Sequence, residues 1–143
     1  MNNLNNIINF NFNKKNVVLR VDYNVTLKDN EIKDTIRIDN TIETINFLLK
    51  KDINNLIIIS HLGRPGGKII NGLTLKPIFN YLQNYIPSLI FLNLDDCLSK
   101  INNYHKKVIL LENIRFYPEE ERKGDNDKID IFEKKLSKLG EIF

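Results

Sequence analysis

The sequence predicts an α/β fold in which helices cover both faces of a parallel sheet, a three-layer αβα arrangement. Short, continuously apolar runs, typical of strands buried on both faces, alternate with segments of helical periodicity. With 143 residues, of which 42% are hydrophobic, the chain is long enough to form one domain with its own core. Residues 1–143 are therefore expected to form a single unit, without an internal repeat or linker.

Four buried strands are expected from the apolar runs at residues 17–21, 56–59, 89–92 and 108–111. Ile142 and Phe143 read as the start of a fifth strand. In a parallel sheet all carboxyl ends meet at one edge, and ligands bind in the loops outside that edge. The loops after the first, second and fourth strands are therefore the places to look for a site.

Helical periodicity fills the segments between these strands. The first helix carries an apolar face formed by Ile38, Ile42, Ile45, Leu48 and Leu49. Either Asp34 or Thr35 is expected to cap it. The second helix is expected to begin at the N-cap Thr74, to hold Pro77 in its first turn and to carry an apolar face formed by Leu75, Ile78, Leu82 and Tyr85.

Two further helices are expected in the second half of the chain. A short one is predicted over residues 96–103. The last has an apolar face formed by Ile129, Phe132, Leu136 and Leu139. Gly140 stands where a left-handed C-cap would end that helix. Residues 117–128, rich in Glu and Lys, are expected to form a solvated loop that includes Arg122.

Composition excludes several functional classes. The net charge is +3 and the lysines are dispersed, which argues against a nucleic-acid partner. The chain has neither the charged start and apolar run of a secretory signal nor an apolar run that approaches a membrane span, so a cytoplasmic protein without a membrane partner is expected. Cys97 is the single cysteine, which excludes an internal disulfide and a multi-cysteine metal cluster.

Arginine is rare and concentrated near predicted strand and helix ends. Only five of the 21 basic residues are arginines: Arg20, Arg37, Arg64, Arg115 and Arg122. The planar guanidinium grips a carboxylate or phosphate through two parallel hydrogen bonds and keeps its charge. The first four are therefore candidates for holding one anionic ligand from several sides.

The loops that carry these arginines offer further polar groups. Asp22 and Asn24 share a face of an extended segment with Arg20, and both can bond a substrate hydroxyl. His61 and Arg64 lie in a Gly- and Pro-containing loop. Each feature also has a purely structural explanation. Arg20, Asp22 and Asn24 can form an internal ion pair with an Asx turn, and the loop of His61 and Arg64 can be an ordinary turn. Arg37 can be a surface charge at the start of a helix. His105 is expected to be exposed and uninvolved.

Motifs for other chemistry are missing from the sequence. There is no P-loop and no Gly-x-Gly-x-x-Gly turn for a nucleotide, and no Ser-His-Asp or Cys-His arrangement can be argued. Asp95 and Asp96 are too isolated to propose as a metal site. The sequence therefore predicts an anion-binding face, with no metal or cofactor held by this chain.

Taken together, four segments resemble the amino-terminal domain of the phosphoglycerate kinase family: residues 20–25, 34–38, 60–65 and 110–116. The His-Leu-Gly-Arg-Pro and Glu-Asn-x-Arg-Phe segments, in this order, are highly specific to that family. The resemblance runs from about Val17 to Phe143. It implies a Rossmann-like amino-terminal domain that binds 3-phosphoglycerate.

The resemblance also implies residue roles. The family moves a phosphoryl group reversibly between 1,3-bisphosphoglycerate and magnesium ADP, giving 3-phosphoglycerate and ATP. Asp22 and Asn24 match positions that hold the glycerate. The basic cluster around its carboxylate and phosphate is matched by Arg20, Arg37, His61, Arg64 and Arg115. Arg37 matches the catalytic arginine, which stabilises the transferring phosphoryl group.

Two departures from the family pattern stand out. Thr26 replaces a usual proline, and the sequence stops at Phe143, before another substrate arginine, the hinge and the nucleotide domain that binds magnesium ATP or ADP. The domain is therefore expected to be incomplete at its C-terminus. A monomer is also expected. Three hypotheses stay open: the front part of the kinase, active only when the rest follows; a non-catalytic module that binds 3-phosphoglycerate or phosphate; and an inactive remnant.

Overall fold

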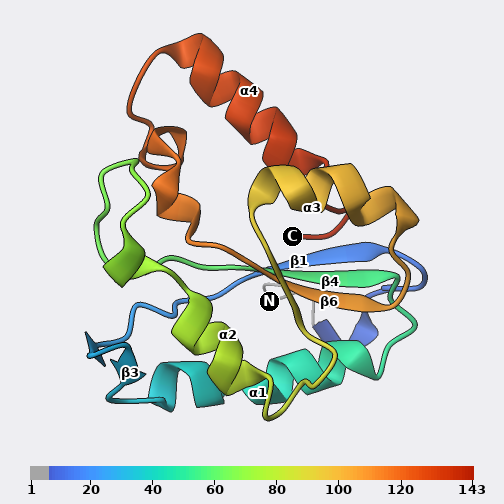
Figure 1. Cartoon of the computed structure of the whole chain (residues 1–143). Helices are drawn as coiled ribbons and strands as arrows, with labels where there is room; N and C mark the ends of the chain where they lie inside the picture. Colours follow the sequence, from blue (N-terminus) through green and yellow to red (C-terminus); the bar gives the residue numbers. More distant parts are fainter. Residues whose placement is uncertain (1–6) are drawn as a thin grey trace, which may run out of the picture.

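A computed structural model describes residues 7–143 and contains a four-stranded parallel sheet in the order β1-β4-β6-β5 (Figure 1). The strands are β1 (Asn16–Arg20), β4 (Asn55–Ile59), β5 (Ile90–Leu92) and β6 (Lys107–Leu111). The central strands β4 and β6 are almost wholly buried, which explains why their sequences are continuously apolar. The four predicted strands and their parallel arrangement are confirmed.

The predicted fifth strand begins beside β1. Ile142 forms a parallel bridge with Val17, and the Val18 N–H donates to the Ile142 carbonyl over 2.8 Å. The expectation for Gly140 was wrong, because its φ is not positive. A Cβ at Gly140 would instead lie 2.6 Å from the Asn16 carbonyl oxygen. Close backbone approach, and not a left-handed cap, therefore requires this glycine.

Helices cover both faces of the sheet, as the αβα prediction requires. In Figure 1, α1 (Ile36–Leu49) and α2 (Lys76–Leu82) lie below the sheet, while α3 (Leu94–Lys100) and α4 (Asn126–Ser137) lie above it. Alternate residues of β4 serve the two layers, since successive strand side chains point to opposite faces. Leu56 and Ile58 pack with the lower helices, and Ile57 and Ile59 with the upper ones.

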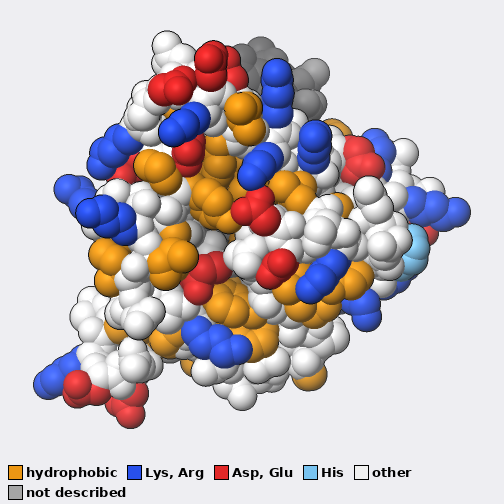
Figure 2. Space-filling model, turned by 45° about the horizontal axis from the view of Figure 1, so that its top comes forward, with side chains coloured by type: hydrophobic (Ala, Val, Ile, Leu, Met, Phe, Trp, Pro, Cys, Tyr) orange, Lys and Arg blue, Asp and Glu red, His pale blue; other side chains and the backbone are white. Residues whose placement is uncertain are grey.

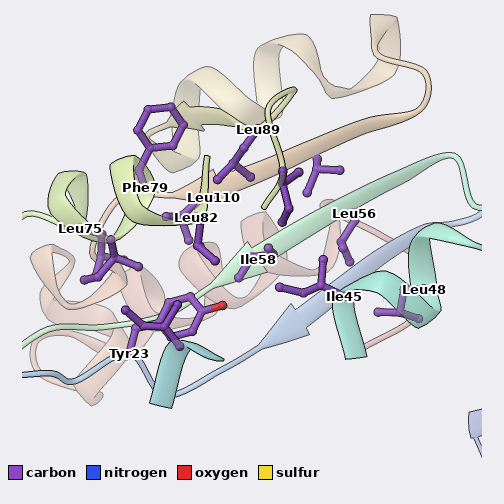
Figure 3. Close-up of a cluster of buried hydrophobic side chains, with 14 of the residues drawn as sticks. Tyr23, Ile45, Leu48, Leu56, Ile58, Leu75, Phe79, Leu82, Leu89 and Leu110 are labelled. Carbon is purple, nitrogen blue, oxygen red and sulfur yellow. The ribbon is translucent and has the colours of Figure 1, made fainter. Parts of the chain in front are cut away.

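The lower core is the larger of the two (Figure 3). Ile45 and Leu48 of α1 meet Leu82 of α2 and the strand residues there, and all are essentially buried. Tyr23, from the loop after β1, is fully buried in the same cluster, with its hydroxyl 2.7 Å from the Thr41 hydroxyl. The burial raises the pKa of Tyr23 to about 12. This side chain fixes the loop after β1 to the core.

The bounds of two helices differ from the prediction. Thr74 is not the N-cap of α2, since Leu75 holds that position and the Thr74 hydroxyl donates to Glu112 over 2.5 Å. The helix ends at Leu82, so Tyr85 falls outside it and is exposed. The third helix starts before residue 96, because the Asn93 side chain caps it by accepting from the Asp96 N–H. It continues into a 3-10 turn, Ile101–Asn103.

At the start of α1, the two predicted capping residues, Thr35 and Asp34, make different hydrogen bonds. Thr35 occupies the N-cap position without a capping side-chain bond, and its hydroxyl donates to Asp39 over 2.7 Å. Asp34 accepts instead from the Ile36 N–H over 2.9 Å. Both side chains stabilise the start of the helix on which Arg37 lies.

A small hairpin after β1 was missed by the sequence reasoning. It pairs β2 (Leu27–Lys28) with β3 (Glu31–Ile32) through Asp29 and Asn30, which both have positive φ. The Thr26 carbonyl accepts from the Lys33 N–H over 3.0 Å, a bond that a proline at this position can also make. Short 3-10 turns complete the described elements: Ile7–Asn9, Asn71–Leu73, Ile114–Phe116 and Pro118–Glu121. No helix within residues 7–143 is long and apolar enough to cross a bilayer.

Candidate anion-binding site

The loops that follow β1, β4 and β6 lie together at the carboxyl edge of the sheet, on the left in Figure 1. The buried hydroxyl of Ser60 joins the first two loops. It donates to the Val21 carbonyl over 2.8 Å and accepts from the Tyr23 N–H over 2.9 Å. This serine therefore fixes the segment that carries Asp22 and Asn24 against the end of β4.

Asn113 joins the second and third loops in the same way. Its fully buried amide donates to the carbonyls of Leu62 and Leu73, both over 2.8 Å, and accepts from the Arg115 N–H over 3.1 Å. Sequence reasoning missed Ser60 and Asn113 as site-forming residues. The available signal was their position in the sequence, since Ser60 directly precedes His61 and Asn113 lies two residues before Arg115.

Asp22 and Asn24 are tied to other predicted site residues. Asp22 accepts from Arg37 Nη1 over 2.5 Å and from the Asn24 N–H over 3.0 Å, so the Asx turn is present. The internal ion pair left open above forms with Arg37 and not with Arg20. Asn24 accepts from the Gly63 N–H over 2.8 Å. Arg37 and Asp22 keep 55% and 58% of their side-chain surfaces exposed, so a ligand can reach both.

Arg20 and Arg115 share one carboxylate that the sequence reasoning assigned to solvent. Arg20 Nη2 donates to Glu120 Oε1, and Arg115 Nε lies 3.7 Å from Glu120 Oε2. The Glu120 side chain is only 7% exposed. The expectation of a wholly solvated loop over residues 117–128 was therefore wrong at the 3-10 turn η5 (Pro118–Glu121), which is packed against the site.

His61 lies in the electrostatic field of these groups. Partial burial, followed by the charge of Arg115, lowers the pKa of His61 below its ordinary value of 6.5, while Asp22 and Glu120 act in the opposite direction. The imidazole is therefore mainly neutral at pH 7, and it can offer one N–H donor and one acceptor to a ligand.

Arg64 is the most open member of the set. It is exposed and makes no hydrogen bond or ion pair within the part of the chain that the structure describes. Its charge reaches the edge of the site, since Lys123, Arg115 and Arg64 together lower the pKa of Glu121. Gly63, with φ of +61°, turns the chain before it. Arg122, outside the site, pairs with Glu133 over 2.8 Å.

The structure thus brings together six of the seven predicted residues through hydrogen bonds, ion pairs or electrostatic interactions, with Arg64 at the rim. Four guanidinium groups outnumber the three carboxylates paired with them, those of Asp22, Glu120 and Glu121, which leaves a cationic site suited to a small, multiply charged anion. Across the face shown in Figure 2, Lys and Arg mix with Asp and Glu around apolar patches.

A pocket of about 690 Å³ lies beside this site, at the ends of β5 and β6. Its lining combines Phe91, Phe116 and Tyr117 with carboxylates such as Asp95 and Glu112, so it does not suit an anion. Within residues 7–143, no three His, Cys, Asp or Glu side chains gather in a way that could hold a metal ion.

Comparisons with known proteins agree with this geometry. The family model of phosphoglycerate kinase matches residues 7–143. The chain is 37% identical to a phosphoglycerate kinase of Euplotes crassus and 40% identical to one of Plasmodium falciparum, with 90% of this chain covered in each case. The structure of phosphoglycerate kinase from Coxiella burnetii superposes with a TM-score of 0.76 and 30% identity over 93% of this chain.

The coverage is uneven in one respect. This chain spans only about a third of each relative: 34% of the Euplotes protein, 35% of the Plasmodium protein and 32% of the Coxiella structure. The match nevertheless includes every element of the described fold and all seven candidate site residues. The chain therefore belongs to the phosphoglycerate kinase family.

Proposed function

We propose that this chain supplies the 3-phosphoglycerate-binding part of a phosphoglycerate kinase, which transfers a phosphoryl group reversibly between 1,3-bisphosphoglycerate and ADP. The observation that carries the proposal is the convergence of Arg20, Arg37, Arg64, Arg115 and His61 beside Asp22 and Asn24 at one sheet edge, in a chain of this family. The substrate bears a carboxylate and a phosphate, and guanidinium forks suit both groups.

Each residue has a role in this proposal. Asn24 and Asp22 hold the glycerate hydroxyl, and the arginines neutralise the two anionic ends. Arg37 exchanges its Asp22 partner for the transferring phosphoryl group, whose charge one arginine can stabilise by roughly 3 to 5 decades in rate. The neutral His61 orients the substrate through hydrogen bonds.

The described residues do not fit magnesium ATP or ADP. They contain neither a glycine-rich phosphate loop nor a cluster of carboxylates for the metal. The proposal therefore assigns the nucleotide to a part of the enzyme outside these residues, and we expect no ADP-dependent turnover from the 143-residue chain. A monomeric, cytoplasmic protein without nucleic-acid or membrane partners stays a prediction.

A non-catalytic module that binds 3-phosphoglycerate or phosphate is the second candidate. It is favoured by one observation, namely that hydrogen bonds to other residues of this chain position Arg20, Arg37, Asn24 and Arg115. Both candidates predict no turnover by the purified 143-residue chain in a coupled assay. Turnover by the chain alone would contradict our assignment of the nucleotide to another part.

Calorimetric titration tests the binding site itself. We expect 3-phosphoglycerate to bind more tightly than inorganic phosphate or glycerate, because only the full substrate engages both anion positions. Equal affinity for phosphate and 3-phosphoglycerate would remove the glycerate-holding role of Asp22 and Asn24. No heat in a well-folded sample, together with no change in its NMR spectrum, would contradict the proposed site.

A further inference from the structure

We infer that Glu120 is a positioning residue for the anion site, whose buried carboxylate holds Arg20 and Arg115 in their binding orientation. The inference rests on the proposed function and extends it to a residue that does not touch the ligand. Glu120 lies in η5, a hundred residues from Arg20 in the sequence. It therefore connects the end of β1 to the loop that follows β6.

The geometry places the carboxylate behind the arginines. Glu120 is 7% exposed, whereas the side chains of Arg20 and Arg115 are 59% and 24% exposed. One N–H of the Arg20 guanidinium donates to Glu120, and its other N–H groups make no hydrogen bond within residues 7–143. A ligand can therefore approach the open side of Arg20 while Glu120 fixes the opposite side.

Arg115 shows the same division of its donors. Its Nη1 donates to the Gly63 carbonyl over 3.2 Å, which ties it to the loop of His61 and Arg64. Its Nε is buried and has no hydrogen-bond partner among the described residues. The nearest counter-charges are Glu120 Oε2 at 3.7 Å and Glu121 Oε1 at 3.9 Å. A buried cationic N–H is costly without an anion nearby, so Glu120, the nearer and less exposed of the two carboxylates, stabilises Arg115 in this position.

Packing contacts on both sides hold η5 in place. A Cβ at Gly67 would lie 2.5 Å from Pro118 Cβ, so the glycine lets the loop after β4 contact the start of η5. Gly67 also has φ of +75°, which glycine adopts without strain. Behind η5, the ring of Tyr117 packs on Phe132 of α4 with centroids 5.4 Å apart. These contacts hold Glu120 between the two arginines.

Coulomb's law alone makes the opposite prediction from positioning, and this makes the inference testable. Loss of a negative charge beside an anion site should tighten anion binding. If Glu120 holds the arginines in place, its loss should weaken binding in spite of the gain in net positive charge.

The experiment compares Glu120→Ala and Glu120→Gln with Glu119→Ala and Glu119→Gln by titration with 3-phosphoglycerate. Glu119 is the adjacent residue of the same turn, and no hydrogen bond or ion pair of its side chain is present in the described chain. We expect Glu120→Ala to weaken binding about 10-fold and the Glu119 variants to stay within roughly 2-fold of the parent. Glu120→Gln, which keeps an acceptor oxygen, should lie between the parent and Glu120→Ala.

A second readout follows the arginines directly. In the ligand-free chain, the Nε–H NMR signal of Arg115 should be protected from exchange, and Glu120→Ala should remove that protection while Glu119→Ala leaves it. This result does not depend on ligand binding. Absence of 3-phosphoglycerate binding by the parent, with Arg115 protected, would therefore sink the proposed function without sinking the contact.

The outcomes that overturn the inference are equally distinct. If the parent binds but Glu120→Ala binds equally well or more tightly, the carboxylate is a competitor or a bystander and not a positioning residue. Should Glu120→Ala fail to fold, Glu120→Gln decides the question, since parental affinity and parental Arg115 exchange in that variant would contradict the inference.

Discussion

The two ends of the same three strands carry opposite kinds of polar chemistry. At the amino end, Asn55 is fully buried, and its amide donates to Asn16 and to the Tyr104 carbonyl and accepts from the Lys107 N–H. At the carboxyl end, arginines stand partly exposed with donors to spare. A network of neutral amides with complete hydrogen bonding stabilises a fold, whereas charged groups with free donors are suited to a ligand.

Disrupting the Asn55 amide network at the amino end of the strands should have the largest effect on stability. Asn55→Leu keeps the number and branching of the side-chain heavy atoms but leaves Lys107 N–H and Tyr104 C=O without their partner, so we expect a loss of about 3 kcal/mol in the free energy of unfolding. Urea unfolding measures this loss. Asn54→Ala, which removes a less buried amide bonded to the same Asn16 oxygen, is the matched control and should cost clearly less. Equal losses would contradict the special weight given to Asn55.

A second test at the amino end of the strands concerns the close backbone packing of Gly140 against Asn16. Gly140→Ala would drive a methyl group into the Asn16 carbonyl, and we expect a loss of roughly 1–3 kcal/mol. Gly72→Ala is the control, because nothing lies within 4 Å of its added Cβ. Comparable urea midpoints for the two variants would show that the close approach at Gly140 is not needed.

At the carboxyl end of the strands, the expected effect of a substitution is on ligand binding. Arg64→Ala should weaken 3-phosphoglycerate binding about 10-fold, near 1.4 kcal/mol, because one charge-assisted contact is lost. Stability should be unchanged, since Arg64 has no hydrogen bond or ion pair in the described chain. Arg122→Ala removes the same charge from the Glu133 pair away from the site. Equal loss of affinity in both variants would reduce the effect to net charge.

The smallest effect concerns the protonation of His61. Its pKa lies below 6.5 in the free chain because of burial and Arg115. The unfolded chain therefore binds the proton more readily, so this histidine makes the fold less stable as the pH falls below about 6.5. His61→Gln should remove that part of the pH dependence. An imidazole NMR titration of the free chain with a midpoint above 6.5 would contradict the assignment.

Much of this comparison was visible in the sequence, because it depends on local patterns. Continuous apolar runs such as residues 56–59 predicted the buried strands, and the position of arginines after them predicted one binding edge. For Asp22, the structural alternative was an internal ion pair with an Asx turn. Both are present, and the charge partner is Arg37. Which of two nearby arginines pairs with a carboxylate depends on tertiary geometry.

What the sequence could not supply were contacts between distant segments. Glu120 looks solvated in its acidic run, and only the folded chain brings it to Arg20. Gly140 resembles a helix cap in sequence, because the sequence does not show whether a glycine is required for close packing or for a positive φ. Exact helix bounds, as at Thr74, depended on the competing bond to Glu112.

The most direct test of the difference between the two ends is an amide NMR titration of the chain with 3-phosphoglycerate. We predict that shifts change at Asn24, His61, Arg64 and Arg115, and stay unchanged at the Asn55 network at the opposite edge of the sheet. A well-dispersed spectrum with no change, or changes centred on the Asn55 network, would contradict a division of the sheet into a stabilising end and a binding end.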